Sequence, residues 1–222
     1  MISKELYDDY LNALLAGDRG VCLSHVQSLL DRDEAVGVIY KDLIHRSMYE
    51  VGALWERNRI PVSVEHMATA ITESLLPLVY PRVFSTPRIG KKAVVSCIAN
   101  EYHQLGAKIV ADSLELLGWD AYFLGANTPA RDLLSLIEVK QPDLLGLSVA
   151  VYFSVPNLVR AVETVRDAFP ELPVFVGGQA FRWGGLESVA GFRDVTHVEG
   201  LDQLEDAVEQ RFGQLSEGTL WT

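Results

Sequence analysis

The sequence is poor in cysteine, in positive charge and in long apolar runs. Its 222 residues include only two cysteines, Cys22 and Cys97, which lie far apart among apolar residues, so a disulfide framework is not expected and a reducing compartment is indicated. The 19 lysines and arginines are outnumbered by 30 aspartates and glutamates, for a net charge of -11, and direct nucleic-acid binding is therefore not expected. There is neither a signal peptide nor a run of about 18 apolar residues, and we expect a cytoplasmic protein that does not bind membranes.

The first 80 residues contain apolar side chains that recur at helical spacing. The pattern predicts four helices, over residues 6–15, 21–30, 35–54 and from Pro61 to Pro77. The connections between them are short, which favours a four-helix bundle over residues 1–80. Residues 81–90 hold two prolines, a serine, a threonine and a closing glycine, which is the composition of a linker.

Residues 91–222 follow a different pattern, in which strand-like runs alternate with helical segments. The predicted strands are residues 93–98, 121–124, 144–149, 174–176 and 195–198, and the predicted helices are residues 103–117, 130–139, 156–169 and 201–212. This alternation predicts an α/β domain with a doubly wound, parallel, five-stranded sheet of the Rossmann-like kind. Ligands of such sheets bind beyond the carboxyl ends of the strands.

Small and polar residues follow the predicted strands at this edge. After the first strand, Glu101 stands two residues before His103, and Gly106 then allows the next helix to pack closely. The ends of the other strands carry Gly125, Thr128, Ser148, Ala150, Gly177 and Gly178. A lone histidine in a loop is usually a surface residue, and glycine also suits tight turns. Taken together, however, these residues predict a long groove with an imidazole able to bind a metal at its mouth.

Three motifs carry a family resemblance: Glu101-x-His103-x-x-Gly106, Ser148-x-Ala150 and Gly177-Gly178. They resemble the signature of cobalamin-binding domains, an acidic residue, x, His, x, x, Gly, followed by S-x-L and G-G. The resemblance implies that His103 is the lower axial ligand of cobalt, that Glu101 accepts its other N–H, and that the small residues leave room for the nucleotide tail. Glu101 replaces the commoner aspartate, and Ala150 replaces leucine, which leaves the width of the pocket open.

Trp55 is separated by nine residues from Glu65-His66. This W-x9-E-H pattern resembles the cap of adenosylcobalamin-dependent photoreceptors of the CarH type, which are usually fused to a MerR-like DNA-binding domain that this sequence lacks. The resemblance implies that Trp55 covers the adenosyl group and that Glu65 and His66 help to hold it. The residues alone leave other readings open, since Trp55 could be a core residue, Glu65 could complement a helix N-terminus and His66 could face solvent.

The resemblance therefore implies a light sensor that is not an enzyme, with adenosylcobalamin held between the helical cap and the cobalamin-binding domain. Photolysis of the cobalt–carbon bond would change the arrangement of the two. We expect an unidentified protein effector and a homo-oligomer, with a dimer favoured. Some related stand-alone photoreceptors bind a bilin, and four aromatic residues suit either a biliverdin pocket or an ordinary core: Tyr152, Phe153, Phe181 and Trp183.

A second class of protein shares this length and two-part plan. Corrinoid carriers shuttle methyl groups between methyltransferases, bind methylcobalamin and need no W-x9-E-H pattern. A subunit of an adenosylcobalamin mutase is disfavoured because it would need a substrate barrel, for which the sequence has no candidate segment. Three further histidines, His25, His45 and His197, have no metal-ligand spacing and are expected to be surface or satisfied interior residues.

Overall fold

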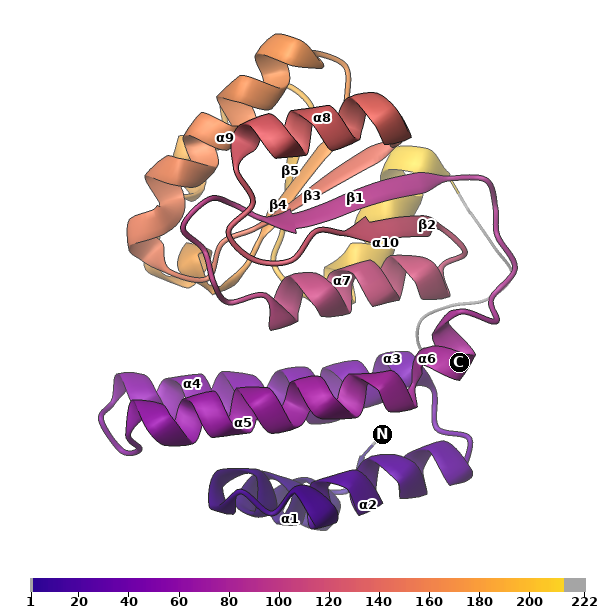
Figure 1. Cartoon of the computed structure of the whole chain (residues 1–222), viewed down its shortest axis with the longest axis vertical. Helices are drawn as coiled ribbons and strands as arrows, with labels where there is room; N and C mark the ends of the chain where they lie inside the picture. Colours follow the sequence, from indigo (N-terminus) through magenta and orange to yellow (C-terminus); the bar gives the residue numbers. More distant parts are fainter. Residues whose placement is uncertain (1, 214–222) are drawn as a thin grey trace. The chain divides into compact units, whose positions relative to one another are not determined.

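The computed structural model describes residues 2–213, which divide into two compact units, residues 2–85 and residues 86–213 (Figure 1). The first unit is helical and the second has an α/β architecture. Together they confirm the predicted fold class, a helical N-terminal part followed by a five-stranded parallel sheet surrounded by helices. No helix within residues 2–213 is long and apolar enough to cross a membrane.

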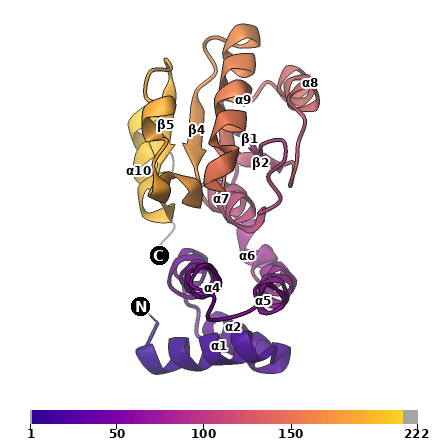
Figure 2. The ribbon, with the colours of Figure 1, turned by 90° about the vertical axis from the view of Figure 1, so that its left-hand side faces the viewer.

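The helical unit contains four long helical stretches. These are α1 (Lys4–Ala16), α2 (Arg19–Asp31), a continuous stretch made of α3 (Val36–Val38), the π-helical segment η1 (Ile39–His45) and α4 (Arg46–Glu56), and finally α5 (Val62–Leu75). Figure 2 views α4 and α5 nearly end-on and shows α1 running across them. The stripe predicted from the sequence is the face that packs, because Tyr10, Leu14 and Ile71 are almost fully buried.

Polar side chains at the N-cap positions determine where the first two helices begin. The Ser3 side chain accepts a hydrogen bond from the Leu6 N–H, and the Asp18 side chain accepts one from the Val21 N–H at 3.0 Å. These bonds satisfy backbone donors that have no partner inside a helix.

The predicted linker begins with a helical turn, which corrects the expectation for residues 81–90. After the short turn η2 (Leu76–Leu78), Tyr80–Val83 forms α6, with Pro81 in its first turn, where a missing N–H costs nothing. Arg82 donates hydrogen bonds to the carbonyl oxygens of Leu30 and Glu34, at 2.6 and 2.9 Å. The first part of the expected linker therefore belongs to the helical unit.

The second unit is built on a parallel sheet with strand order β2-β1-β3-β4-β5. Its strands are β1 (Lys92–Cys97), β2 (Asp120–Phe123), β3 (Leu144–Ser148), β4 (Val174–Gly177) and β5 (Val195–Val198). The register pairs Cys97 with Ser148, Ser148 with Gly177, and Gly177 with Val198. The carboxyl ends of four strands therefore lie in one row along the same edge of the sheet. This is the edge at which the sequence predicts a ligand.

Helices cover both faces of this sheet. Figure 1 shows α8 (Ala130–Lys140) and α9 (Val155–Ala168) on one face, and α7 (Leu105–Leu116) and α10 (Leu201–Phe212) on the other. Between β4 and β5 the chain forms only the short turns η4 (Gln179–Trp183) and η5 (Leu186–Ser188), and the turn η3 (Tyr152–Ser154) follows β3. The main core lies between the sheet and α8 and α9, and includes Val94, Leu133, Ile137, Leu145, Leu147, Leu158, Val162, Val174 and Val176.

Both cysteines are fully buried and behave as small core residues. Burial raises the pKa of the Cys22 thiol to about 11 and that of the Cys97 thiol to about 12. Neither thiol is therefore ionised near neutral pH, as a thiolate nucleophile would have to be.

Candidate functional site

The carboxylate of Glu101 is the most completely hydrogen-bonded side chain at the carboxyl edge of the sheet. Oε1 accepts from the His103 backbone N–H at 3.0 Å, and Oε2 accepts from the N–H groups of Ala150 and Val151 at 2.8 and 3.1 Å. Glu101 is only 1% exposed, and burial alone would raise its pKa. The hydrogen bonds from His103, Ala150 and Val151 instead lower the pKa of Glu101 to about 2.

The same carboxylate orients the imidazole of His103. Nδ1 of His103 lies 2.6 Å from Oε1 of Glu101, and this contact with a carboxylate assigns the ring proton to Nδ1. Nε2 is then the ring nitrogen with a lone pair for a metal. The His103 side chain is 55% exposed, and the Cys97 thiol contacts the His103 carbonyl oxygen at 3.6 Å.

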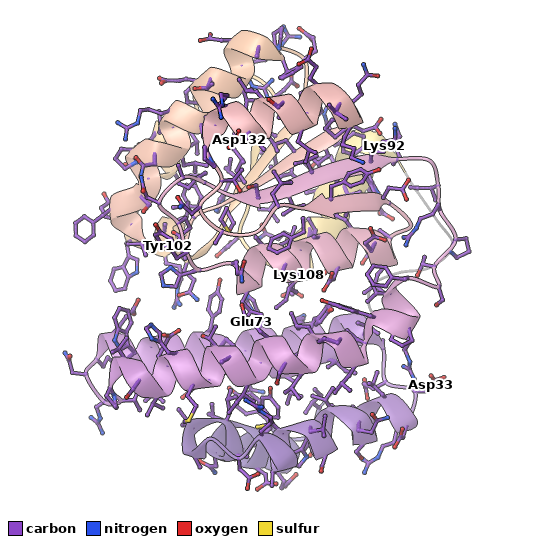
Figure 3. The ribbon with its side chains drawn as sticks, viewed as in Figure 1. Asp33, Glu73, Lys92, Tyr102, Lys108 and Asp132 are labelled. Carbon is purple, nitrogen blue, oxygen red and sulfur yellow. The ribbon has the colours of Figure 1, made fainter. Side chains whose placement is uncertain are left out.

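Figure 3 shows where this loop lies on the domain. Tyr102, between the carboxylate and the imidazole in sequence, stands at the carboxyl end of β1, whereas Lys92 stands at the opposite end of the strand. Lys108 lies on α7, the helix that follows the loop. Tyr102 is 67% exposed, so the loop presents both its aromatic side chain and the neighbouring imidazole at the surface of this unit.

Two glycines at the end of β4, Gly177 and Gly178, lie where backbone segments approach closely. A Cβ atom on Gly177 would lie 2.8 Å from the Val198 carbonyl oxygen, and one on Gly178 would lie 2.1 Å from that of Val149. Gly178 also has φ of 115°, which side chains rarely permit. Both glycines are therefore required by the close approach of backbones inside the domain.

Gly106 differs, and one expectation about it is wrong. A Cβ atom added there would meet nothing within 4 Å, so this glycine does not allow close packing of the helix. It instead leaves open space in the first turn of α7, beside the loop that carries His103. Of the four predicted glycines, Gly106 is the one at which an added Cβ would meet no neighbour.

We expect Gly178→Ala and Gly106→Ala to affect folding very differently. Gly178→Ala should lower the free energy of unfolding by about 2 kcal/mol, because it combines a left-handed φ with a clash against backbone. Gly106→Ala should change it by less than about 1 kcal/mol, since alanine favours a helix and meets no neighbour. Urea denaturation of the cobalamin-free protein measures both, and equal losses in the two variants would contradict this account.

Sequence reasoning missed Asn127, which joins two loops at this edge. Its Oδ1 accepts from the Asn100 N–H at 2.8 Å, and its own N–H donates to the Glu101 carbonyl oxygen at 2.8 Å. Both asparagines have positive φ, 65° for Asn100 and 51° for Asn127. Asparagine is enriched in this conformation, so the residue type just after a predicted strand was a usable signal. The N–H groups of Ala150 and Val151 left no such signal, because any residue type supplies them.

The remaining predicted residues at the sheet edge lie where the strands end. Gly125 has φ of 83° and its carbonyl oxygen accepts from the Cys97 N–H at 3.0 Å, while the Thr128 N–H donates to the Cys97 carbonyl oxygen at 3.4 Å. Ser148 is the last residue of β3 and is half-buried. The structure thus brings Gly125, Thr128 and Ser148 to the end of β1, in the same unit as His103.

Trp55, Glu65 and His66 lie in the helical unit. Trp55 is in the last turn of α4 and is 44% exposed, so it is not a core residue. Glu65 lies in the first turn of α5, where its side chain accepts from the Thr69 hydroxyl at 3.0 Å and lies 3.6 Å from Nε2 of His66. The His66 side chain is 74% exposed. The structure therefore brings Glu65 and His66 together and leaves the indole of Trp55 accessible within its own unit.

The other histidines have partners that explain them. Nε2 of His25 lies 2.7 Å from the Asp9 carboxylate, and the ring of His197 packs edge-on against Phe181 with 4.6 Å between centroids. The centroid of the His45 ring lies 4.1 Å from the centroid of the Tyr49 ring. Burial lowers the pKa of His197. Within residues 2–213, no cluster of three or more histidine, cysteine, aspartate or glutamate side chains could hold a metal ion by itself.

These features define a class of protein: a doubly wound domain whose ligand edge presents an imidazole held by a buried carboxylate. The family described as B12 binding domain matches residues 91–208, more than half of the chain, so the chain belongs to this family. A second family with the same description matches residues 6–79. The second unit is therefore a cobalamin-binding domain, and that part of the expectation is confirmed.

Similar proteins fall into two groups. The chain is 30% identical over 145 residues to the HTH-type transcriptional repressor CarH of Myxococcus xanthus, covering 64% of this chain and 48% of the repressor. It is 30% identical over 124 residues to the repressor CarA of the same organism, covering 56% and 43%. The chain thus spans about half the length of these two relatives.

The second group consists of corrinoid proteins. The dimethylamine corrinoid protein 1 of Methanosarcina acetivorans is 23% identical over 184 residues, which are 80% of this chain and 85% of that protein. The structure of the Methanosarcina barkeri monomethylamine corrinoid protein superimposes with a TM-score of 0.79 over 95% of this chain and 100% of that chain. At 14% identity this superposition shows a shared fold and nothing finer.

Proposed function

We propose that this protein is an adenosylcobalamin-dependent light sensor in which His103 is the lower axial ligand of cobalt. The observation that carries the ligand assignment is the contact between His103 and Glu101. A buried, ionised carboxylate lies against Nδ1 of a half-exposed imidazole at the ligand edge of the sheet, which leaves the lone pair of the ring on Nε2.

The residues present fit a cobalt corrinoid. The imidazole of His103 would supply the one protein ligand that cobalt needs here, because the corrin ring would bring nitrogen ligands of its own. The open space next to Gly106 lies in the same loop and helix start, where a nucleotide tail has room to enter. Bound adenosylcobalamin would contribute a cobalt–carbon bond that visible light breaks. The chain's own contribution would be to hold His103 in the tautomer whose lone pair is on Nε2.

The helical unit supplies residues suited to an adenosyl group. The indole of Trp55 is accessible and flat, and can stack on adenine. Glu65 and His66 stand side by side at the start of α5 and offer a carboxylate and an imidazole to the polar edges of the group. We propose that loss of the adenosyl group on illumination removes these contacts and that the signal passes to a protein effector, without catalytic turnover.

An absorption spectrum tests the proposal directly. Protein reconstituted in the dark with adenosylcobalamin should lose the adenosylcobalamin spectrum under green light and change its mobility in size-exclusion chromatography. The mobility reports the domain arrangement and the expected dimer. Photolysis without any change in mobility would remove the sensing step from the proposal while leaving cobalamin binding intact.

We expect Trp55→Ala to narrow the preference for adenosylcobalamin over methylcobalamin. Stacking of aromatic rings adds about 0.5 to 1.5 kcal/mol beyond the burial of area, which corresponds to a preference of about tenfold. Leu23→Ala is a matched control, because Leu23 is 43% exposed in the same unit and lies on α2, far in sequence from the W-x9-E-H pattern. Titrations with both cobalamins measure the ratio.

A carrier of methyl groups is the second candidate function. It is favoured by the match to the dimethylamine corrinoid protein 1, which extends over 85% of that protein and so includes both units. This reading predicts equal or tighter binding of methylcobalamin. If the wild-type protein binds methylcobalamin as well as adenosylcobalamin, the carrier becomes the better proposal.

Our proposal includes a bilin as a second chromophore, which the exposed aromatic residues of the second unit support. Tyr152, Phe153 and Trp183 are 43%, 88% and 65% exposed, so for these three the alternative of an ordinary core residue is wrong. Phe181 is half-buried against His197. Added biliverdin should produce far-red absorption that is weakened in Trp183→Ala. Absence of such bands in the wild-type protein would remove the bilin and leave the cobalamin sensor unaffected.

A further inference from the structure

The loop that carries His103 contains one residue in the left-handed conformation, and a neighbouring loop holds it in place. Asn100, just before Glu101, has φ of 65°, a conformation that residues other than glycine rarely adopt. A loop with such a residue needs surrounding contacts to keep it in one conformation. The Asn100 N–H donates a hydrogen bond to Oδ1 of Asn127 at 2.8 Å, so the contact comes from the neighbouring loop.

Asn127 contacts the backbone on both sides of the Asn100–Glu101 peptide pair. Its side-chain Oδ1 accepts a hydrogen bond from the backbone N–H of Asn100. Its backbone N–H donates to the carbonyl oxygen of Glu101 at 2.8 Å. The neighbouring backbone extends this contact, since the Thr128 N–H donates to the carbonyl oxygen of Cys97. The connection between β2 and α8 is therefore attached to the loop after β1 at consecutive points.

This attachment sets the position of the buried carboxylate. Glu101 must reach two N–H groups after β3 with Oε2 and the His103 ring with Oε1, and its backbone is the part that Asn127 fixes. A displacement of the Glu101 backbone would change the distance between Oε1 and Nδ1 of His103, now 2.6 Å. The orientation of the imidazole therefore depends on a residue that the sequence places 24 positions later.

We infer that Asn127 is a positioning residue for the cobalt ligand His103, acting through Glu101; this inference rests on the proposed role of His103. The side chain has two properties that the position requires. It tolerates φ of 51°, and it provides an acceptor for the Asn100 N–H. Glycine retains the first property and aspartate retains both, so the two substitutions separate conformation from hydrogen bonding.

The test uses the full chain with adenosylcobalamin for affinity and with the cob(II)alamin form for electron paramagnetic resonance. We expect Asn127→Gly to weaken adenosylcobalamin binding about tenfold, the lower end of the range for residues that orient metal ligands. It should also reduce the fraction of cob(II)alamin whose spectrum shows nitrogen coupling from histidine. Asn127→Asp should stay within about threefold of the wild type and keep the coupling.

Gln141→Gly is the matched control, because Gln141 also has a left-handed φ, 47°, but lies at the end of α8, at the other edge of the sheet. It should leave affinity and coupling unchanged. Coupling and affinity of Asn127→Gly equal to those of the wild type would overturn the inference, as would Asn127→Asp behaving like Asn127→Gly. Nitrogen coupling absent already from the wild-type protein would instead overturn the ligand assignment, and the inference with it.

Discussion

Replacing His103 by alanine should remove the nitrogen coupling from the cob(II)alamin spectrum and weaken cobalamin binding by about 100-fold. The expected loss is large because, in our proposal, Nε2 of His103 binds cobalt while Nδ1 lies 2.6 Å from Oε1 of Glu101. Substitution of a residue that merely orients a metal ligand lowers metal affinity about 10- to 100-fold. Substitution of the ligand itself should lower it by at least about 100-fold.

Two further variants make this result specific. Tyr102→Ala removes an exposed side chain next to His103 and should leave the coupling intact, which controls for disturbance of the loop. Imidazole added to His103→Ala should restore nitrogen coupling if the site remains otherwise formed. Coupling that survives in His103→Ala would show that another histidine binds cobalt, and would contradict the assignment.

Replacing Glu101 by glutamine should destabilise the cobalamin-free protein by about 3 kcal/mol near neutral pH, and this difference should shrink in acid. The pKa of Glu101 falls from 4.5 to about 2 in the folded protein, and each unit corresponds to about 1.4 kcal/mol. A carboxylate with a lowered pKa contributes its full stability above the unfolded value, near 4.5. It loses that contribution as the pH falls through the folded value, near 2.

Urea denaturation of wild type and Glu101→Gln at several pH values between about 3 and 7 measures this difference. Glu138→Gln is the control, because Glu138 is an exposed residue of α8 and should change stability little at any pH. A difference between wild type and Glu101→Gln that stays constant from neutral pH into acid would show that the ionised carboxylate does not stabilise the fold. The geometry of the hydrogen bonds would then need another explanation.

Much of the fold could be predicted because the two units have different apolar periods. The run Ala93–Cys97 is buried at every position, as expected for a strand with helices on both faces, and the helical stripe of the first unit is likewise the buried face. The prediction failed where proline was read as a stop. Pro81 lies in the first turn of α6, because a proline there lacks only a donor that has no partner in a helix.

The sequence by itself determined that Glu101 and His103 follow the first strand of a parallel sheet, and local spacing is sufficient to place them at its ligand edge. Only the tertiary structure decided that Ala150 and Val151 donate to Glu101 and that Asn127 supports the loop, since these contacts join residues 49, 50 and 27 positions apart. It also decided that a Cβ atom added at Gly106 would enter open space, whereas one added at Gly178 would clash with a backbone carbonyl oxygen. The physical reason is that backbone donors and close approaches between strands depend on the register of the sheet, which no local pattern of residue types encodes.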